Sequence, residues 1–336
     1  MSTASRAWVY NHEGYPRGLR LTSLPTKSTL SPTELRVRVK AAAINPVDIQ
    51  LMNLPLWSYL PPFLAAPERA TAEDFSGVVE AAGENAGFKA GDEIFGMVMI
   101  LSTGTLQEVI QFDAASAVLA PKPSQWSWEQ AAALPLVYLT ARTMIASVTP
   151  YVGTSGKPRV AVLGGSSSTG IYCVQLAAAR GWEVIASCSG RNTDLVRDMG
   201  ATQVLDYTTT SVPEKIRTFA PDAILDCVGG TECLGLARRY VTIVGDKTSR
   251  ASVGGSVIYL WNPRMLIRSI LGRLGLGRSY ACINLESNRK YLEETVGMAI
   301  EKIVIDSTFN FEDAAAAFER LNTGRARGKV VVRVSE

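Results

Sequence analysis

Residues 160–171 read VAVLGGSSSTGI, and the chain continues to residue 181 as YCVQLAAARG. The branched apolar run predicts a buried strand, the paired glycines a tight turn, and the apolar spacing after them a helix. Free N–H groups and the dipole at the start of that helix favour an anion, which glycine lets the backbone approach closely. A dinucleotide pyrophosphate is the usual occupant of such a unit. The predicted loop consists of Gly164, Gly165, Ser166, Ser167, Ser168, Thr169 and Gly170, whose hydroxyls add further donors.

Strand and helix patterns alternate on both sides of this turn. We expect strands at 159–163, 183–187, 203–206, 223–228 and 240–244, and helices at 169–180, 192–199 and 212–219. Alternation at this pace implies βαβ units and a parallel sheet. The fold class is therefore α/β, with a doubly wound Rossmann domain predicted over residues 126–289.

Residues 1–125 follow a different pattern, rich in short strands. LRVRVKAAAINPVD at 35–48 predicts a strand entering a polar loop, and DFSGVVEAAGENAGFKAGDEIFGMV at 74–98 predicts strands separated by glycine and asparagine turns. The chain returns to this style near its end, with a predicted helix at 312–322 and a closing strand, GKVVVRV, at 328–334. We therefore expect a β-rich domain formed by residues 1–125 and completed by residues 290–336.

The end of the second predicted strand indicates which dinucleotide binds. NAD-selective Rossmann sites have an acid there that accepts a hydrogen bond from the ribose 2′-hydroxyl. Here the stretch WEVIASCSGRNTDL, residues 182–195, places Ser187, Ser189, Arg191 and Asn192 at that position. A guanidinium and hydroxyls bind a 2′-phosphate that a carboxylate would repel, so we expect NADPH.

Composition excludes several classes of function. A formal charge of +3 over 336 residues, without a basic block, argues against a nucleic-acid partner. No apolar stretch is long enough to span a membrane, and we expect a cytoplasmic protein. The histidine His12 and an odd set of cysteines without C-x-x-C spacing offer almost no material for a zinc site, so no metal is predicted.

Three other interpretations of the glycine turn fail. A P-loop needs Gly-Lys followed by Ser or Thr, which is absent. A hydrolase elbow needs G-x-S-x-G and a later histidine, whereas His12 precedes the turn. A methyltransferase usually has an acid at the second strand that binds the ribose hydroxyls, and the second strand predicted here lacks one.

Several motifs together resemble the medium-chain dehydrogenase/reductase superfamily over nearly the whole chain. They are AAAINPVD, DFSGVV, AGDEIFG, GTLQEV, AAALPLVYLTA, VLGGSSSTGIYCVQLA, LVRDMGATQVLDY, ILDCVGG and GRARGKVVV. The chain is most similar to the zinc-free quinone-oxidoreductase and trans-acting enoyl-reductase branch of fungal secondary metabolism. It is also similar to the reticulon-4-interacting-protein-like NADPH oxidoreductases. The resemblance implies a GroES-like catalytic domain before the Rossmann domain.

The same resemblance implies a zinc-independent, NADPH-dependent reduction of an activated C=C bond in an enoyl, enone or quinone. Hydride would add at the β-carbon and a proton at the α-carbon, as in polyketide-type biosynthesis. The implied partners are a small-molecule substrate, which a carrier protein could hold, and a synthase. The implied oligomeric state is a monomer or a homodimer. Two alternatives stay open: a non-catalytic NADPH-binding sensor or partner protein, and an NADP-dependent alcohol dehydrogenase that acts without metal.

The resemblance also implies site residues. Beside the nicotinamide it places Asn45, Val47, Asp48, Gln50 and Thr140. At the 2′-phosphate it places Ser189, Gly190, Arg191 and Asn192, and at the adenosine end Tyr207. Cys227 and Val228 would line the end of the next strand, and Lys329 would reach the cofactor phosphate from the return segment. Tyr59 and Tyr138 are the predicted proton donors, with packing as the alternative role of each. Water or a substrate hydroxyl could serve instead.

Two segments depart from the family pattern. The stretch before Tyr240 is short, which predicts a trimmed fifth βα unit. NPRMLIRSILGRLGLG, at 262–277, sets arginines among leucines and isoleucines. This second segment is compatible with an active-site cover, a subunit contact or a helix on a membrane surface.

Overall fold

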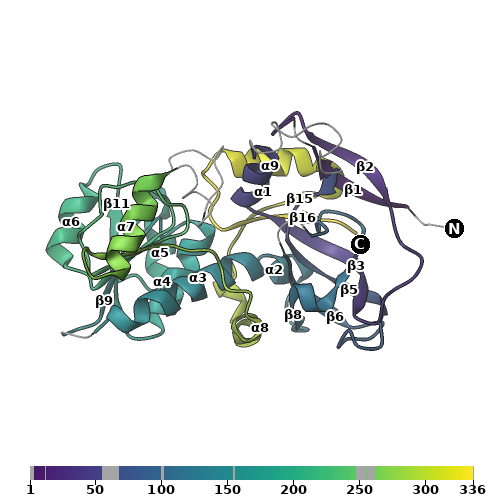
Figure 1. The fold of residues 1–336 in the computed structure, drawn as a ribbon, viewed down its shortest axis with the longest axis horizontal. Helices are drawn as coiled ribbons and strands as arrows, with labels where there is room; N and C mark the ends of the chain where they lie inside the picture. The colour runs from purple at the N-terminus through teal and green to yellow at the C-terminus, as the bar shows by residue number, and fades with distance from the viewer. Residues whose placement is uncertain are drawn as a thin grey trace. The chain divides into compact units, whose positions relative to one another are not determined.

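The computed structural model describes residues 4–11, 13–54, 68–99, 102–153, 156–246, 255 and 262–335. The chain divides into two compact units (Figure 1), Met1–Leu136 with Ser287–Glu336, and Val137–Glu286. We call them the first and the second unit. The domain boundaries predicted at residues 125 and 289 stay predictions.

The second unit contains a six-stranded parallel sheet in the order β11-β10-β9-β12-β13-β14. Its strands are β9 (Arg159–Leu163), β10 (Glu183–Cys188), β11 (Gln203–Asp206), β12 (Ala223–Asp226), β13 (Arg239–Thr242) and β14 (Ser279–Cys282). Its helices are α3 (Pro135–Val148), which begins in the first unit, α4 (Ser168–Ala178), α5 (Thr193–Asp198), α6 (Val212–Phe219) and α7 (Pro263–Arg273). This strand order is the doubly wound Rossmann order, so the predicted fold class is confirmed.

The predicted elements of this unit match the structure closely. The predictions for 159–163, 203–206 and 212–219 coincide with β9, β11 and α6. No helix lies in residues 227–238, all of which the structure describes, so the β12–β13 crossover is trimmed as expected. In its place Cys233 and Ala237 pack with Tyr240 in the core of the unit.

The first unit contains two sheets. A small one has the order β2-β1-β4, formed by β1 (Ala4–Tyr10), β2 (Leu19–Pro25) and β4 (Arg69–Ala70). The larger has the order β15-β16-β3-β5-β6-β8, with β7 also paired to β3. Its strands are β3 (Glu34–Ile44), β5 (Asp74–Ala82), β6 (Glu93–Val98), β7 (Val109–Asp113), β8 (Ala117–Pro121), β15 (Ile305–Asn310) and β16 (Lys329–Arg333).

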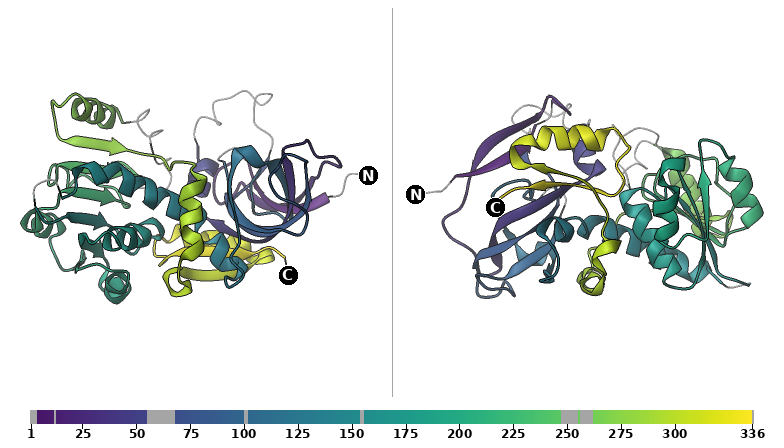
Figure 2. Two further views of the ribbon diagram at one scale, coloured as in Figure 1. Left: turned by 90° about the horizontal axis from the view of Figure 1, so that it is seen from below. Right: turned by 180° about the vertical axis from the view of Figure 1, so that it is seen from behind.

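Short helices complete the first unit: α1 (Pro46–Met52), α2 (Trp128–Ala132), α8 (Arg289–Glu293) and α9 (Ala314–Asn322). Figure 2 shows α9 lying along β15 and β16, where Phe318 enters the core together with Phe75 of β5. The pairing of β16 with β3 ties the end of the chain to the N-terminal strands. Within the described residues, no helix has the length and apolarity needed to cross a membrane.

Candidate cofactor site and candidate proton-transfer site

The glycine turn of the second unit joins β9 to α4. Gly164 has φ of +79°, a conformation that L side chains rarely adopt. The Ser167 hydroxyl caps α4 by accepting a hydrogen bond from Gly170 N at 3.1 Å. A Cβ at Gly170 would lie 2.1 Å from the Gly164 carbonyl oxygen, so the turn closes only with glycine there.

The end of β10 holds this turn in place. Ser187 accepts hydrogen bonds on both of its oxygens, from Gly164 N to Oγ at 3.1 Å and from Gly165 N to the carbonyl oxygen at 2.7 Å. The turn is therefore fixed before any ligand arrives, with the first N–H groups of an 11-residue helix at its rim.

The predicted 2′-phosphate loop follows β10 and contacts the glycine turn through Asn192. The buried Asn192 amide donates to Ser166 Oγ at 3.0 Å and to Ser189 Oγ at 3.2 Å. No described residue donates a hydrogen bond to its buried Oδ1 atom. An acceptor left in this state fits a ligand that carries hydroxyl or amide donors.

A carboxylate that we did not predict lies against the same loop. Asp206, at the end of β11, has its Oδ2 atom 2.4 Å from where a Cβ at Gly190 would stand. Hydrogen bonds from Thr208 and from Gly190 lower the pKa of Asp206, so this group is ionised at neutral pH. Arg191, which follows Gly190 in the chain, is exposed. The loop thus presents a guanidinium and a carboxylate together, and their balance decides the charge that an adenosine ribose would meet.

The other predicted residues of this unit lie at the same edge of the sheet or on α3. Tyr207 is 60% exposed after β11, and Val228 is 53% exposed after β12. Val228 lies against Gly164, where a Cβ would meet its Cγ1 atom at 2.3 Å. A neighbouring thiol, that of Cys173, and burial raise the pKa of Cys227, which favours its protonated form at neutral pH.

The predicted residues on α3 are buried. Thr140 is 6% exposed. Tyr138 is 3% exposed, and its ring packs edge-on against that of Tyr172 with centroids 5.9 Å apart. Tyr59, the other predicted proton donor, lies outside the described residues.

The first unit holds a buried polar cluster around the start of α1. Asn45 Nδ2 donates to Asp74 Oδ2 at 2.9 Å, and Asn45 N donates to Asp48 Oδ2 at 2.7 Å. Asp48 Oδ1 accepts from Ala72 N at 3.0 Å. Of the predicted residues here, Asp48 and Gln50 are 2% and 3% exposed, whereas Val47 is partly buried against the core. We call Asn45, Asp48, Glu73, Asp74 and Lys329 the acid cluster.

Lys329 supplies the positive charge of the acid cluster. Its ammonium donates to Asp74 Oδ2 at 2.8 Å and to Asn45 Oδ1, and the side chains of Lys329 and Asp74 are 1% and 0% exposed. We predicted that this ammonium would reach a cofactor phosphate. In the structure it is bonded within the first unit.

Burial and like charge raise the pKa of two carboxyls in the acid cluster, those of Asp48 and Glu73. The side chains of Asp48, Glu73, Asp74 and Lys329 are all buried, and the charges of the other three act on Glu73. Burial raises the pKa of Asp48 to about 7. Burial, and next the charges of Asp48 and Asp74, raise the pKa of Glu73 well above its ordinary value. Glu73 therefore holds its proton to a higher pH than an exposed glutamate does.

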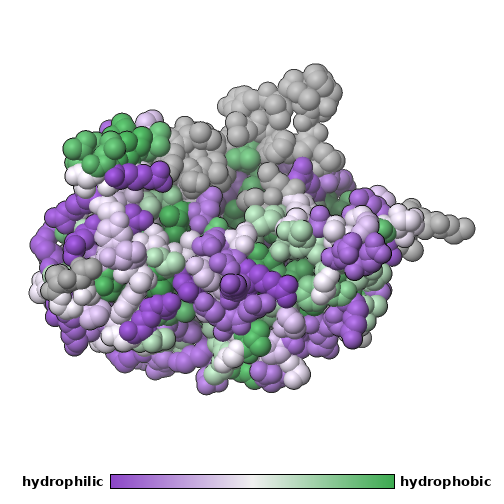
Figure 3. Space-filling view, turned by 60° about the horizontal axis from the view of Figure 1, so that its bottom comes forward, coloured by the Kyte–Doolittle hydropathy of each residue, from purple (hydrophilic) through white to green (hydrophobic). Residues whose placement is uncertain are grey.

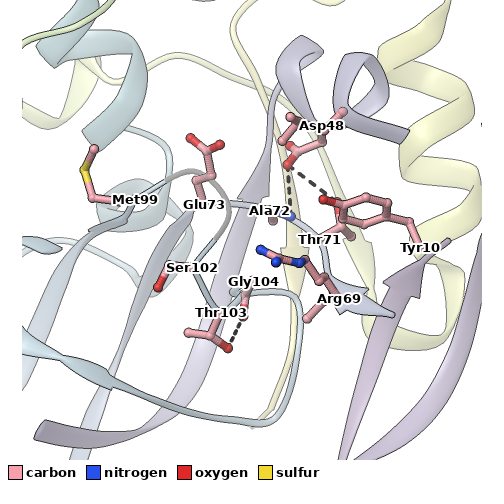
Figure 4. A pocket seen from close by; sticks show the side chains of 12 residues that line it. Tyr10, Asp48, Arg69, Thr71, Ala72, Glu73, Met99, Ser102, Thr103 and Gly104 are labelled. Carbon is pink, nitrogen blue, oxygen red and sulfur yellow. Dashed lines mark hydrogen bonds between the residues drawn. The ribbon is translucent and has the colours of Figure 1, made fainter. Parts of the chain in front are cut away.

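Glu73 opens onto a small pocket (Figure 4). The pocket is lined by Tyr10, Asp48, Leu51, Arg69, Ala70, Thr71, Ala72, Glu73, Met99, Ser102, Thr103 and Gly104. In Figure 4 the Glu73 carboxyl stands apart from the hydrogen-bonded group of Asp48 and Ala72, and no described residue donates to its buried Oε1 atom. Ala72, just before it, has φ of +66°, a strained backbone of the kind found at functional sites. This arrangement holds a buried carboxyl with a raised pKa beside a cavity.

Sequence reasoning missed Glu73 and Asp206. The signal for Glu73 is the acid pair Glu73-Asp74 directly before the apolar run of β5, because adjacent acids at the start of a buried strand need partners. The signal for Asp206 is weaker, a single acid at a strand end.

Glu73 should make stability depend on pH. Folding raises the pKa of Glu73, so the folded chain keeps a proton that the unfolded chain loses. The contribution of Glu73 to the free energy of unfolding is therefore fully present below the ordinary glutamate pKa of 4.5 and is lost as pH rises through the raised pKa. Glu73→Gln removes this titration with little change of shape. We expect its stability relative to the unmodified chain to rise by up to about 1.4 kcal/mol per pH unit as pH increases above roughly 5, until the raised pKa of Glu73 is passed. Urea unfolding at several pH values measures this, with the exposed Glu84→Gln as the control.

One unit has a β-rich fold, and the other has a parallel sheet with a glycine turn. Together they define a class of proteins that bind a dinucleotide. Comparisons with known proteins identify the family. The profile of the alcohol dehydrogenase GroES-like domain matches residues 31–122, and that of the zinc-binding dehydrogenase matches residues 199–332. The mitochondrial NAD(P)H oxidoreductase RTN4IP1 of Mus musculus is 31% identical over 360 residues, covering 99% of this chain and 90% of the relative. The trans-enoyl reductase pgmF of Aspergillus terreus is 30% identical over 357 residues, covering 98% and 96%.

Among solved structures, the quinone oxidoreductase of Coxiella burnetii superposes with a TM-score of 0.78 at 24% identity, covering 99% of this chain and all of that one, which shows a shared fold. The chain therefore belongs to the medium-chain dehydrogenase/reductase superfamily and is an oxidoreductase, as its motifs predicted. In the part of the chain that the structure describes, no group of three or more His, Cys, Asp or Glu side chains could hold a metal ion.

Proposed function

We propose that the chain is an NADPH-dependent reductase of activated C=C bonds, in an enoyl, enone or quinone substrate, that works without zinc. The observation that carries the proposal is the buried Glu73 carboxyl, which lines the pocket of the first unit and whose pKa burial raises. Reduction of a conjugated alkene needs a proton as well as a hydride, and a buried acid with a raised pKa can provide it. The names of the relatives, a trans-enoyl reductase and NAD(P)H oxidoreductases, agree with this reaction class.

The second unit fits a dinucleotide. The glycine turn, with its helix N-terminus, would hold the pyrophosphate, and the unpaired Oδ1 atom of Asn192 would accept from a ribose hydroxyl or a base amine. Bound NADPH supplies the hydride for the β-carbon of the substrate.

The acid cluster would provide the proton. Glu73 would donate it to the α-carbon, directly or through water, so that one hydride and one proton together saturate the C=C bond. The resulting Glu73 carboxylate would face Asp48 and Asp74, and their repulsion favours its return to the acid form. Tyr138 and Tyr59 are the alternative donors proposed from the sequence.

Consumption of NADPH against a panel of enones, quinones and enoyl thioesters tests the proposal. We expect turnover with at least one of these substrate classes, and no loss of activity after dialysis against a chelator. Tight NADPH binding without turnover on any of them would instead support a non-catalytic sensor. Oxidation of alcohols with NADP as the main activity would support the dehydrogenase alternative.

Arg191 should set the choice of cofactor. Because a guanidinium binds the 2′-phosphate and Asp206 repels it, Arg191→Glu should raise the Kd of NADPH at least about tenfold and change that of NADH little. Fluorescence titration of both cofactors measures this, with the exposed Arg217→Glu of the same unit as control. Tighter binding of NADH than of NADPH by the unmodified chain would contradict the NADPH assignment.

Three further parts of the proposal rest on the resemblance. They are a role in secondary-metabolite biosynthesis, a synthase that presents a carrier-bound substrate, and a place in the cytoplasm. Named relatives in animals are mitochondrial, so fractionation of the source cells is the direct test of location.

A further inference from the structure

The helix α7 of the second unit has its apolar face turned to solvent. Leu266, Ile267, Ile270, Leu271 and Leu274 are 44%, 56%, 46%, 40% and 65% exposed, and Leu276, just after the helix, is 73% exposed. At about 100° per residue the first five form one continuous stripe along the helix. Figure 3 shows it as a hydrophobic patch at one side of the second unit. We call these six residues the α7 patch.

The other face of α7 fixes the patch in this orientation. Met265 and Ser269 are 0% and 5% exposed, and α7 packs against the edge strand β14. Gly272 packs closely against the backbone of residues 278–280, where a Cβ on Gly272 would stand 2.7 Å from the Arg278 carbonyl oxygen. Arg268 binds Asp246 at 2.9 Å and lies over the Tyr280 ring. A helix anchored in this way cannot roll its leucines inward.

The charge around the patch is positive. Residues 262–285 contain four arginines and no aspartate or glutamate. Arg264, Arg273 and Arg278 are exposed. On a helical projection Arg264 and Arg273 fall on opposite flanks of the apolar stripe.

This pattern favours an anionic lipid surface over a second copy of the chain. Two copies meeting face to face through a two-fold axis would bring these exposed arginines together, with no carboxylate in residues 262–285 to pair with them. A bilayer accepts apolar side chains between its headgroups, and its anionic headgroups pair with the flanking guanidiniums.

We propose that the α7 patch docks the protein on the surface of an anionic bilayer, with the leucines and isoleucines between the headgroups and Arg264 and Arg273 on lipid phosphates. The contact is peripheral, since no helix of the described residues could cross the membrane. It would place the enzyme where apolar substrates such as long-chain enones or quinones concentrate.

Co-sedimentation with vesicles tests this proposal on the full chain. We expect binding to equimolar phosphatidylglycerol and phosphatidylcholine vesicles, weak binding to phosphatidylcholine alone, and weakening by salt. Ile267→Ser with Ile270→Ser should lower the partition coefficient at least about tenfold. Arg264→Gln with Arg273→Gln should lower it about fivefold for each arginine.

Matched controls lie in the first unit. Ile300→Ser removes an isoleucine that is 40% exposed, and Arg17→Gln removes an exposed arginine; both should bind vesicles like the unmodified chain. An unchanged urea midpoint shows that each variant is folded. The proposal fails if the unmodified chain stays in the supernatant, if the paired variants bind as it does, or if sizing without lipid reveals a dimer that the serine pair splits.

Discussion

Glu73→Gln is expected to lower kcat for reduction of an enone or quinone by about a hundredfold, within the usual range for loss of a general acid. The glutamine keeps the size of the side chain and its place at the pocket but has no proton to give. Because Glu73 lies outside the residues proposed to hold the cofactor, the Kd of NADPH should stay within about twofold of the original. Steady-state rates and fluorescence titration measure the two quantities.

The pH profile separates proton donation from a merely structural role. With Glu73 as donor, the rate of the unmodified chain should fall as pH rises through the raised pKa of Glu73, and this limb should be absent in the glutamine variant. The exposed Glu84→Gln serves as control. Tyr138→Phe tests the donor predicted from sequence: an unchanged rate in Glu73→Gln with a large loss in Tyr138→Phe would move the donor to α3.

Local signals in the sequence were sufficient for the Rossmann unit. The apolar run of β9 and the helical spacing of α4 lie on either side of a glycine turn, and each signal is contained in a few consecutive residues. The turn, the loop after β10 and the residues after β12 were found together, because the carboxyl ends of parallel strands share one edge of a sheet.

The acid cluster could not be found in this way. Lys329 and Asp74 are 255 positions apart, and Asp48 meets Ala72 across 24 positions. These contacts depend on the pairing of β16 with β3 and of β3 with β5, which no local periodicity encodes. The same contrast separates the glycine turn from Asp206. The turn is a motif of consecutive residues, whereas the contact of Asp206 with Gly190 exists only after β11 has paired with β10.

Lys329→Met should destabilise the chain by about 3 kcal/mol, because it removes one partner of a buried ion pair and leaves the other charge behind. Asp74, 0% exposed, would keep hydrogen bonds from Asn45 Nδ2 at 2.9 Å and from Leu136 N at 2.8 Å but lose its cation. Adding Asp74→Asn should recover part of the loss, since no uncompensated charge then remains. Urea unfolding measures both, with the exposed Lys290→Met as control. A loss below about 1 kcal/mol, equal to the control, would mean that water reaches the pair, and the raised pKa of Glu73 would lose its physical basis.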